Sequence, residues 1–109
     1  MFIENHAVIP TECGDGVSRR ILGTGGTLMM VEVTFRKGGV GTPHTHVHEQ
    51  VSYVAKGSFD FTLDGITRRL RVGDSVYIPS GVMHGTVALE DSVIVDVFTP
   101  IREDFLSGK

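Results

Sequence analysis

An all-β fold, built as a small sandwich or barrel in a single domain, is the fold class that the sequence predicts. Short runs rich in Val, Ile, Phe, Thr and Tyr alternate with breaks that contain glycine. The 14 glycines and 4 prolines imply many tight turns. Helical periodicity is weak throughout, and 109 residues suit one domain.

The expected strands follow one another with short breaks. Residues 1–16 are predicted to be irregular, the first strand is expected to end at the glycine-rich residues 23–26, and residues 102–106 could form one helical turn. In chain order, the predicted strands cover residues 17–22, 27–36, 44–55, 58–63, 66–72, 75–78, 82–89 and 92–99.

Alternation and turn signals define these strands. The strongest one, residues 27–36, places Met29, Val31, Val33 and Phe35 on one face. Asp64–Gly65 predicts a type I′ hairpin, and Glu90–Asp91 predicts a second hairpin between the last two strands. With no long helical crossover, such a chain must close or double its sheet to avoid exposed edges, and a barrel of about eight strands can hold one small ligand.

Charge and composition exclude several classes of protein. The net charge of −3 gives no basic excess that would indicate a nucleic acid or an anionic membrane as partner. No apolar run approaches the roughly 20 residues of a membrane span, and the start lacks the pattern of a signal peptide. Cys13 is the single cysteine, so no intrachain disulfide can form, and a reducing cytoplasm is the expected location.

The richest group of metal-binding side chains lies at residues 44–50, HTHVHEQ. If this stretch is extended, every second side chain points the same way. The residues of one face would then be His44, His46, His48 and Gln50. Imidazole is the commonest protein metal ligand at neutral pH, so this row predicts a metal site. A chance cluster on a solvent-facing strand is the alternative.

Two spaced motifs in the chain resemble those of the cupins. The first is formed by Gly38, His44, His46, Gln50 and Gly57, and the second by Gly73, Pro79, Gly81 and His84. The resemblance implies a single-domain cupin-type jelly-roll β-barrel over residues 1–109, with its core at about residues 17–99, and often a homodimer, which exposed valines and Tyr53 would suit. It also implies that one divalent transition metal ion, Ni, Zn, Fe or Mn, is held by His44, His46, Gln50 and His84.

The chain departs from the cupin motifs at two positions. Gln50 stands where the first motif usually has Glu, and Ala88 stands where the second often has Asn. Three neutral imidazoles and a neutral amide would leave the full divalent charge on the ion, which favours Lewis-acid chemistry on an anion over stabilisation of high-valent iron. The ligand types do not identify the metal. His48 is skipped by the motif and is expected to line the pocket or support the ligands.

A second informative stretch covers residues 93–102. Val93, Val95 and Val97 share one face, which leaves Asp96 and Phe98 directed into the barrel. A buried acid needs a partner or a role, so Asp96 is either paired with an arginine for structure or is a general acid/base near the metal. Arg102 could fold over the mouth of the barrel and contact a carboxylate with its planar guanidinium.

This stretch narrows the resemblance. Residues 96–102, DVFTPIR, together with residues 44–50 and the opening GVSRRIL at 16–22, are similar to the small cupins of pectin and alginate breakdown, the KdgF type. Those proteins convert 4,5-unsaturated monouronates to linear keto forms by ring opening and enol ketonisation. The resemblance implies a metal-dependent isomerase with a small anionic sugar as substrate. It also implies that Asp96, Phe98 and Arg102 are the catalytic group.

Two other classes of function stay open from the sequence. A metal-dependent dioxygenase could use the same barrel, although the neutral Gln50 argues mildly against it. A non-catalytic sugar- or effector-binding module is the second alternative, because a fold and a metal site do not establish turnover. An acid and a guanidinium close to the metal, as expected for Asp96 and Arg102, would count against simple binding.

Overall fold

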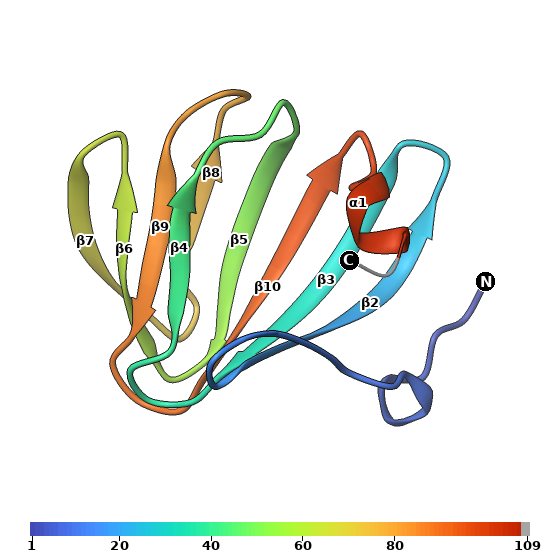
Figure 1. The fold of residues 1–109 in the computed structure, drawn as a ribbon, viewed down its shortest axis with the longest axis horizontal. Coiled ribbons are helices and arrows are strands. Elements are labelled where there is room, and N and C mark those ends of the chain that lie inside the picture. Colours follow the sequence, from blue (N-terminus) through green and yellow to red (C-terminus); the bar gives the residue numbers. More distant parts are fainter. Residues whose placement is uncertain (108–109) are drawn as a thin grey trace.

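Two antiparallel β-sheets make up most of the computed structural model, which describes residues 1–107 (Figure 1). Along the larger sheet the strand order is β1-β2-β3-β10-β5-β8, and along the smaller sheet it is β4-β9-β6-β7. The strands are β1 Thr11–Gly14, β2 Val17–Gly25, β3 Leu28–Phe35, β4 Val40–His44, β5 Glu49–Lys56, β6 Ser58–Leu63, β7 Ile66–Arg71, β8 Ser75–Ile78, β9 His84–Ala88 and β10 Ser92–Thr99. The prediction of an all-β fold is confirmed.

Two short helices flank the strands. The 3-10 helix η1 covers Asn5–Ala7, and α1 covers Glu103–Leu106, close to the one helical turn that was predicted. No helix within residues 1–107 is long and apolar enough to cross a membrane. The predicted domain runs to residue 109, and its last two residues lie outside the described part of the chain.

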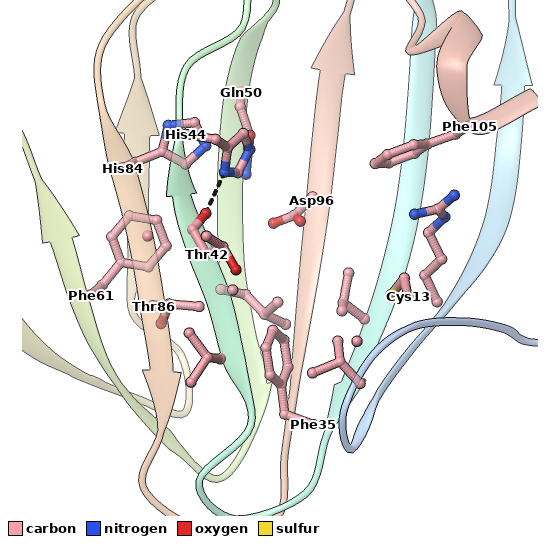
Figure 2. A pocket seen from close by; sticks show the side chains of 18 of the residues that line it. Cys13, Phe35, Thr42, His44, Gln50, Phe61, His84, Thr86, Asp96 and Phe105 are labelled. Atoms are coloured by element: carbon pink, nitrogen blue, oxygen red, sulfur yellow. Dashed lines mark hydrogen bonds between the residues drawn. The ribbon is translucent and has the colours of Figure 1, made fainter. Parts of the chain in front are cut away.

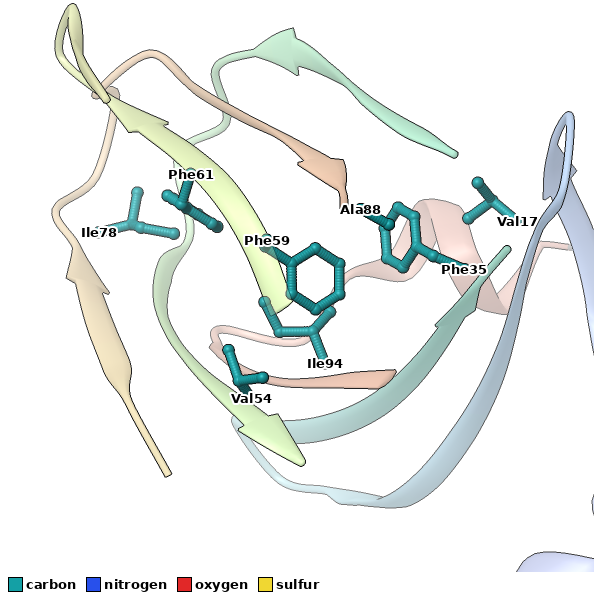
Figure 3. Close-up of a cluster of buried hydrophobic side chains, with 8 residues drawn as sticks. All are labelled: Val17, Phe35, Val54, Phe59, Phe61, Ile78, Ala88 and Ile94. Atoms are coloured by element: carbon teal, nitrogen blue, oxygen red, sulfur yellow. The ribbon is translucent and has the colours of Figure 1, made fainter. Parts of the chain in front are cut away.

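The core forms where the inward faces of the two sheets meet (Figure 3). Alternation places Phe59 and Phe61 of β6 inward, while Phe35 of β3 and Ile94 of β10 come from the other sheet. The rings of Phe35 and Phe59 meet edge to face with their centroids 5.1 Å apart, a favoured aromatic geometry. The two-residue periodicity of these strands is therefore what brings the sheets together.

The turn at Asp64–Gly65 has the predicted conformation. Both residues have positive φ, 49° at Asp64 and 80° at Gly65, as a type I′ turn requires. This turn joins β6 to β7, whose strands pair in register from Leu63–Ile66 outward.

The structure corrects the prediction for the N-terminal part of the chain. Residues 1–16 are not irregular throughout, since η1 and β1 form there, and β1 pairs with β2 along Thr11–Arg19 and Glu12–Ser18. The glycine-rich segment does not end β2 at residue 22, because pairing with β3 continues to Gly25 beyond an irregularity after Ile21. β1 and the last residues of β2 are strands because they pair with a neighbouring strand, so the alternation of their own residues could not reveal them.

The predicted hairpin across Glu90–Asp91 is wrong. β9 pairs with β4 and β6 in the smaller sheet, whereas β10 lies between β3 and β5 in the larger one. The chain therefore changes sheets at this turn. The strands belong to two separate sheets rather than to one continuously hydrogen-bonded ring. Turn residues look the same whether the next strand pairs with the last or crosses to the other sheet.

Gly57 occupies a place that no other residue can fill without a shift of the backbone. It joins β5 to β6 with a φ of 73°, and an added Cβ would overlap Oγ of Ser92 and lie 2.7 Å from the carbonyl oxygen of Asp91. Ser92 is fully buried and hydrogen-bonded, so it cannot move aside cheaply. We expect Gly57→Ala to destabilise the protein by about 3 kcal/mol, measured by urea unfolding. Gly65→Ala, at a φ of 80° but with open space around it, is the control and should cost only the backbone strain.

Candidate metal centre and adjoining pocket

The histidine-rich stretch is not the single strand that was predicted. β4 ends at His44, residues 45–48 form a loop, and β5 begins at Glu49. β4 belongs to the smaller sheet and β5 to the larger one, so the chain must cross between sheets inside this stretch. The predicted row of donors on one strand face is therefore wrong, although His44, His46 and Gln50 still come together in space.

Three imidazoles converge where β4, the loop and β9 come together. His44 ends β4 and is paired in register with His84 at the start of β9, and His46 follows in the loop. One ring nitrogen of each of these three histidines lies within 4.8 Å of the others. The ring centroids are 4.4 Å apart for His44 and His84, and 4.8 Å apart for His46 and His84. A set of nitrogen atoms this close can share one cation.

The backbone fixes which nitrogen of each ring faces the cluster. Nδ1 of His44 lies 2.7 Å from the carbonyl oxygen of Thr42, and Nδ1 of His84 lies 2.9 Å from that of Val82. A carbonyl only accepts, so Nδ1 carries the proton and Nε2 keeps its lone pair. Nε2 of His84 is buried and has no hydrogen-bond partner. Backbone acceptors behind the rings are the arrangement that orients histidine ligands toward a metal.

His46 and Gln50 give the clearest sign that a cation fits. Nδ1 of His46 donates to the carbonyl oxygen of His48 at 3.0 Å, so its Nε2 is an acceptor. That Nε2 lies 2.9 Å from Oε1 of Gln50, which is also an acceptor. The lone pairs of these two atoms repel each other at this distance, and a cation bound by both atoms would remove the repulsion. Burial lowers the pKa of both His46 and His84, which keeps the imidazoles neutral and able to bind a metal.

Asp96 lies in the same pocket and points inward from β10, as the alternation predicted (Figure 2). The pocket has a volume of about 580 Å³, and its lining includes His44, Gln50 and His84. The partner of Asp96 is a hydroxyl rather than an arginine, since Oγ of Ser52 donates to Oδ1 at 2.6 Å. Burial raises the pKa of Asp96 to about 6, against the opposing effects of hydrogen bonds from Ser52 and Gln50. A carboxyl group in this range can exchange protons near neutral pH.

Arg102 and Phe98 line the pocket on the side of the C-terminal helix. The guanidinium of Arg102 lies 4.1 Å from the ring centroid of Phe105 and 5.3 Å from that of Phe98. Asp104 accepts hydrogen bonds from its Nε at 3.2 Å and from its Nη2 at 2.8 Å. An arginine has five N–H groups, so it can still donate to an anion in the pocket.

Three further residues line the pocket although no site role was predicted for them from the sequence. Phe105 belongs to α1, and Cys13 and Arg19 belong to β1 and β2. The guanidinium of Arg19 lies 3.9 Å from the ring centroid of Phe105. These side chains reach the pocket only because the N-terminal strands and α1 pack near each other, which local patterns do not encode. Cys13 is exposed and was assigned no role.

His48 stays close to the cluster without joining it. Its ring centroid lies 5.3 Å from that of His46 and 6.4 Å from that of Phe98. Among the described residues, its Nδ1 is one of two buried side-chain polar atoms without a partner. Its side chain is not among those that line the pocket, and a supporting role for His48 stays a prediction. Glu49 is exposed and accepts a hydrogen bond from the hydroxyl of Tyr77.

The raised pKa of Asp96 predicts how the stability of the metal-free protein depends on pH. The folded carboxyl group has a pKa of about 6 against an ordinary value of 3.8, so the folded state binds its proton more tightly than the unfolded state. The contribution of Asp96 to stability is therefore highest below pH 4 and falls as the pH rises to 6, by about 3 kcal/mol in all. The Asp96→Asn protein has no carboxyl group to ionise at this position, so its stability should not show this decrease between pH 4 and 6. The check is the difference between the urea unfolding free energies of the two proteins from pH 4 to 7, which should widen with pH; a constant difference would contradict the prediction.

Comparisons with known proteins show which proteins this sequence and fold are similar to. The cupin domain family matches residues 31–98. The pectin degradation protein KdgF of Dickeya dadantii is 48% identical over 97 residues, which are 87% of this chain and 88% of that protein. The structure of KdgF from Halomonas sp. superposes with a TM-score of 0.93 at 43% identity, covering 96% of this chain and 97% of that one. A RmlC-like cupin from Shewanella frigidimarina superposes with a TM-score of 0.92 at 39% identity, covering 95% and 94% of the two chains.

Proposed function

Because the chain belongs to the cupin domain family, we propose that it is a metal-dependent enzyme that opens 4,5-unsaturated monouronates to linear keto-uronates during the breakdown of pectin or alginate. The KdgF proteins that it resembles over most of its length support this reaction class. One observation in the site carries the proposal: Asp96 shares a pocket with a three-imidazole cluster and with Arg102.

The proposed ligands of the metal are His44, His46, His84 and Gln50. Their support is the convergence of three imidazole nitrogens and the close approach of Oε1 of Gln50 to Nε2 of His46. The site suits one divalent transition metal ion, and Ni, Zn, Fe and Mn are the candidates. Such an ion in a neutral donor set would supply Lewis acidity, which lowers the energy of negative charge that develops close to it.

The proposed role of Asp96 is to move one proton. The substrate is a cyclic hemiacetal with a C4=C5 double bond and a carboxylate on C5. The carboxylate of Asp96 takes the proton of the C1 hydroxyl as the C1–O5 bond breaks, which leaves an aldehyde at C1 and an enolate across C4, C5 and O5. The same group then gives the proton to C4, and C5 becomes the ketone. Every atom is conserved, so the reaction is an isomerisation.

Arg102 and Phe98 are proposed to position the sugar. The N–H groups of Arg102 that Asp104 leaves open can donate to the C5 carboxylate. Phe98 is nearly fully buried between the histidine cluster and Arg102, where its ring can cover one face of the sugar. Close orientation by these two groups would hold the C1 hydroxyl and C4 within reach of Asp96.

Arg102→Lys should raise KM about tenfold with a smaller change in kcat. A lysine is a point charge that cannot reproduce either the stacking on Phe105 or two parallel hydrogen bonds to a carboxylate. Loss of one charge-assisted hydrogen bond is worth about 1.5–3 kcal/mol, at least a factor of ten. Initial rates over a range of substrate concentrations test this, with Arg68→Lys on the exposed strand β7 as the matched control. An unchanged KM would remove Arg102 from substrate binding.

The direct test of the function is turnover of an unsaturated monouronate by the purified protein. The C4=C5 bond absorbs ultraviolet light and is lost in the reaction, so the absorbance should fall faster than in buffer alone. A chelator should return the rate to the uncatalysed value, and an added divalent ion should restore it. If the metal-loaded protein left the rate unchanged, the proposed function would be wrong.

Several finer properties are part of the same proposal. We propose that residues 1–109 form one jelly-roll cupin domain with its barrel core at about residues 17–99, and the facing of the two sheets supports this. A homodimer is supported by the exposed side chains of Val51, Tyr53 and Tyr77 on the outer face of the larger sheet. The cytoplasm is the proposed location, with a small anionic sugar rather than a nucleic acid or membrane as partner.

A further inference from the structure

Ser52 lies fully buried between the proposed metal ligand Gln50 and the acid Asp96. All three side chains point into the space between the sheets, since Ser52 follows Gln50 by two residues on β5 and Asp96 faces Ser52 across the β5–β10 pairing. Nε2 of Gln50 lies 2.8 Å from Oγ of Ser52, and Oγ of Ser52 lies 2.6 Å from Oδ1 of Asp96. The three groups form one continuous hydrogen-bonded chain.

The direction of this chain follows from the number of protons. A serine hydroxyl has one proton, and the short contact to a carboxylate oxygen uses it. Oγ of Ser52 can then only accept from its other neighbour, so the NH₂ group of Gln50 must point toward Ser52. The amide is planar, and its oxygen is therefore turned the opposite way, toward Nε2 of His46 at 2.9 Å.

We infer that Ser52 is a positioning residue that fixes the side-chain amide of Gln50 with its oxygen, rather than its nitrogen, facing the metal. An amide nitrogen has no lone pair to offer a cation, so only one of the two amide orientations makes Gln50 a ligand. Without the hydroxyl of Ser52, the NH₂ group would gain by turning toward the bare Nε2 of His46 and donating to it. A metal ion would then have to break that hydrogen bond before it could bind.

The inference rests on the metal site of the proposed function but not on the substrate, so its test measures metal binding and not turnover. Metal-free protein is titrated with Zn²⁺ in a calorimeter. Ser52→Ala should weaken Zn²⁺ binding about tenfold, the lower end of the range for residues that orient metal ligands. Ser92→Ala is the matched control, because Ser92 is an equally buried strand hydroxyl on the far side of the core from the histidines, and its Zn²⁺ affinity should be unchanged.

A second background separates orientation from general damage. A carboxylate has two equivalent oxygens and cannot be turned the wrong way, so in a Gln50→Glu protein the further change Ser52→Ala should weaken Zn²⁺ binding less than threefold. A similar loss in both backgrounds would mean that Ser52 acts through packing, and would overturn the inference. An unchanged affinity of Ser52→Ala in the Gln50 background would overturn it as well.

The unaltered protein provides a measurement that does not depend on any variant folding. The side-chain amide protons of Gln50 should show nuclear Overhauser contacts to the β-protons of Ser52 both before and after Zn²⁺ is added. Contacts from these amide protons to the ring of His46 in the metal-free protein would show the opposite orientation, and would refute the role of Ser52.

Discussion

Asp96→Asn should lower kcat for the unsaturated monouronate by about 10²–10⁴-fold, the range for loss of a positioned acid/base. Asparagine has the same shape, and its oxygen can still accept the hydrogen bond from Ser52. It cannot take up the proton of the C1 hydroxyl or return it to C4. Zn²⁺ affinity should stay within about threefold, which calorimetry on the metal-free protein would measure.

The stability of this variant distinguishes a chemical effect from misfolding. Because burial makes the ionised carboxyl group costly, Asp96→Asn should be at least as stable as the parent protein at pH 7. Asp60→Asn is the matched control, since Asp60 is a partly exposed strand aspartate that pairs with Arg69 away from the pocket. Normal turnover by Asp96→Asn would remove Asp96 from the mechanism.

His84→Ala is the second change with a large expected effect, and it should reduce both Zn²⁺ affinity and turnover to background. His84 is 4% exposed and its unpartnered Nε2 faces two other imidazoles. Loss of a direct ligand should exceed the 10–100-fold loss that follows removal of the groups behind a ligand, so we expect a weakening of more than about 100-fold. The metal content after dialysis and the calorimetric affinity are the measurements.

Because His84 is buried, its removal also affects packing, and a second ligand variant separates loss of metal binding from a packing defect. His44 is exposed, unlike His84, so His44→Ala should leave the unfolding free energy of the metal-free state close to that of the parent and still lose Zn²⁺ binding. His6→Ala is the control for removing an exposed histidine, as His6 lies outside the cluster beside Glu4. Retention of tight Zn²⁺ binding by both ligand variants would exclude this site as the metal centre.

The parts of the site that lie on regular strands were predictable. Asp96 and Phe98 face inward because β10 alternates without interruption, and that alternation is visible in the residues themselves. His84 and His44 could be associated only through the resemblance to cupin motifs, since their pairing joins strands 40 residues apart in the chain. Local periodicity contains no information about such a partner.

Two of the wrong predictions have a common physical origin. The stretch at residues 44–50 and the turn at Glu90–Asp91 are both places where the chain passes from one sheet to the other. A segment that crosses between sheets contains the same polar and extended residues as a continuing strand or a hairpin. Which sheet the next strand joins depends on the edge or apolar face that each sheet offers, and this is a property of the whole fold. Ser52 was not predicted for a related reason. Its role depends on its hydrogen bonds to Gln50 and Asp96, and Asp96 is distant in the sequence.

The donors of the cluster are divided between the two sheets, with His44 and His84 on the smaller one and Gln50 on the larger. An ion bound by all of them would link the two sheets at one end of the sandwich. The sheets could then separate at that end only after the ion is released, so local opening of the sandwich and loss of the ion would be coupled. We therefore expect free metal to stabilise the folded chain by a free energy that grows with the logarithm of the metal concentration above the dissociation constant, and to slow proteolysis of the chain as that free energy rises.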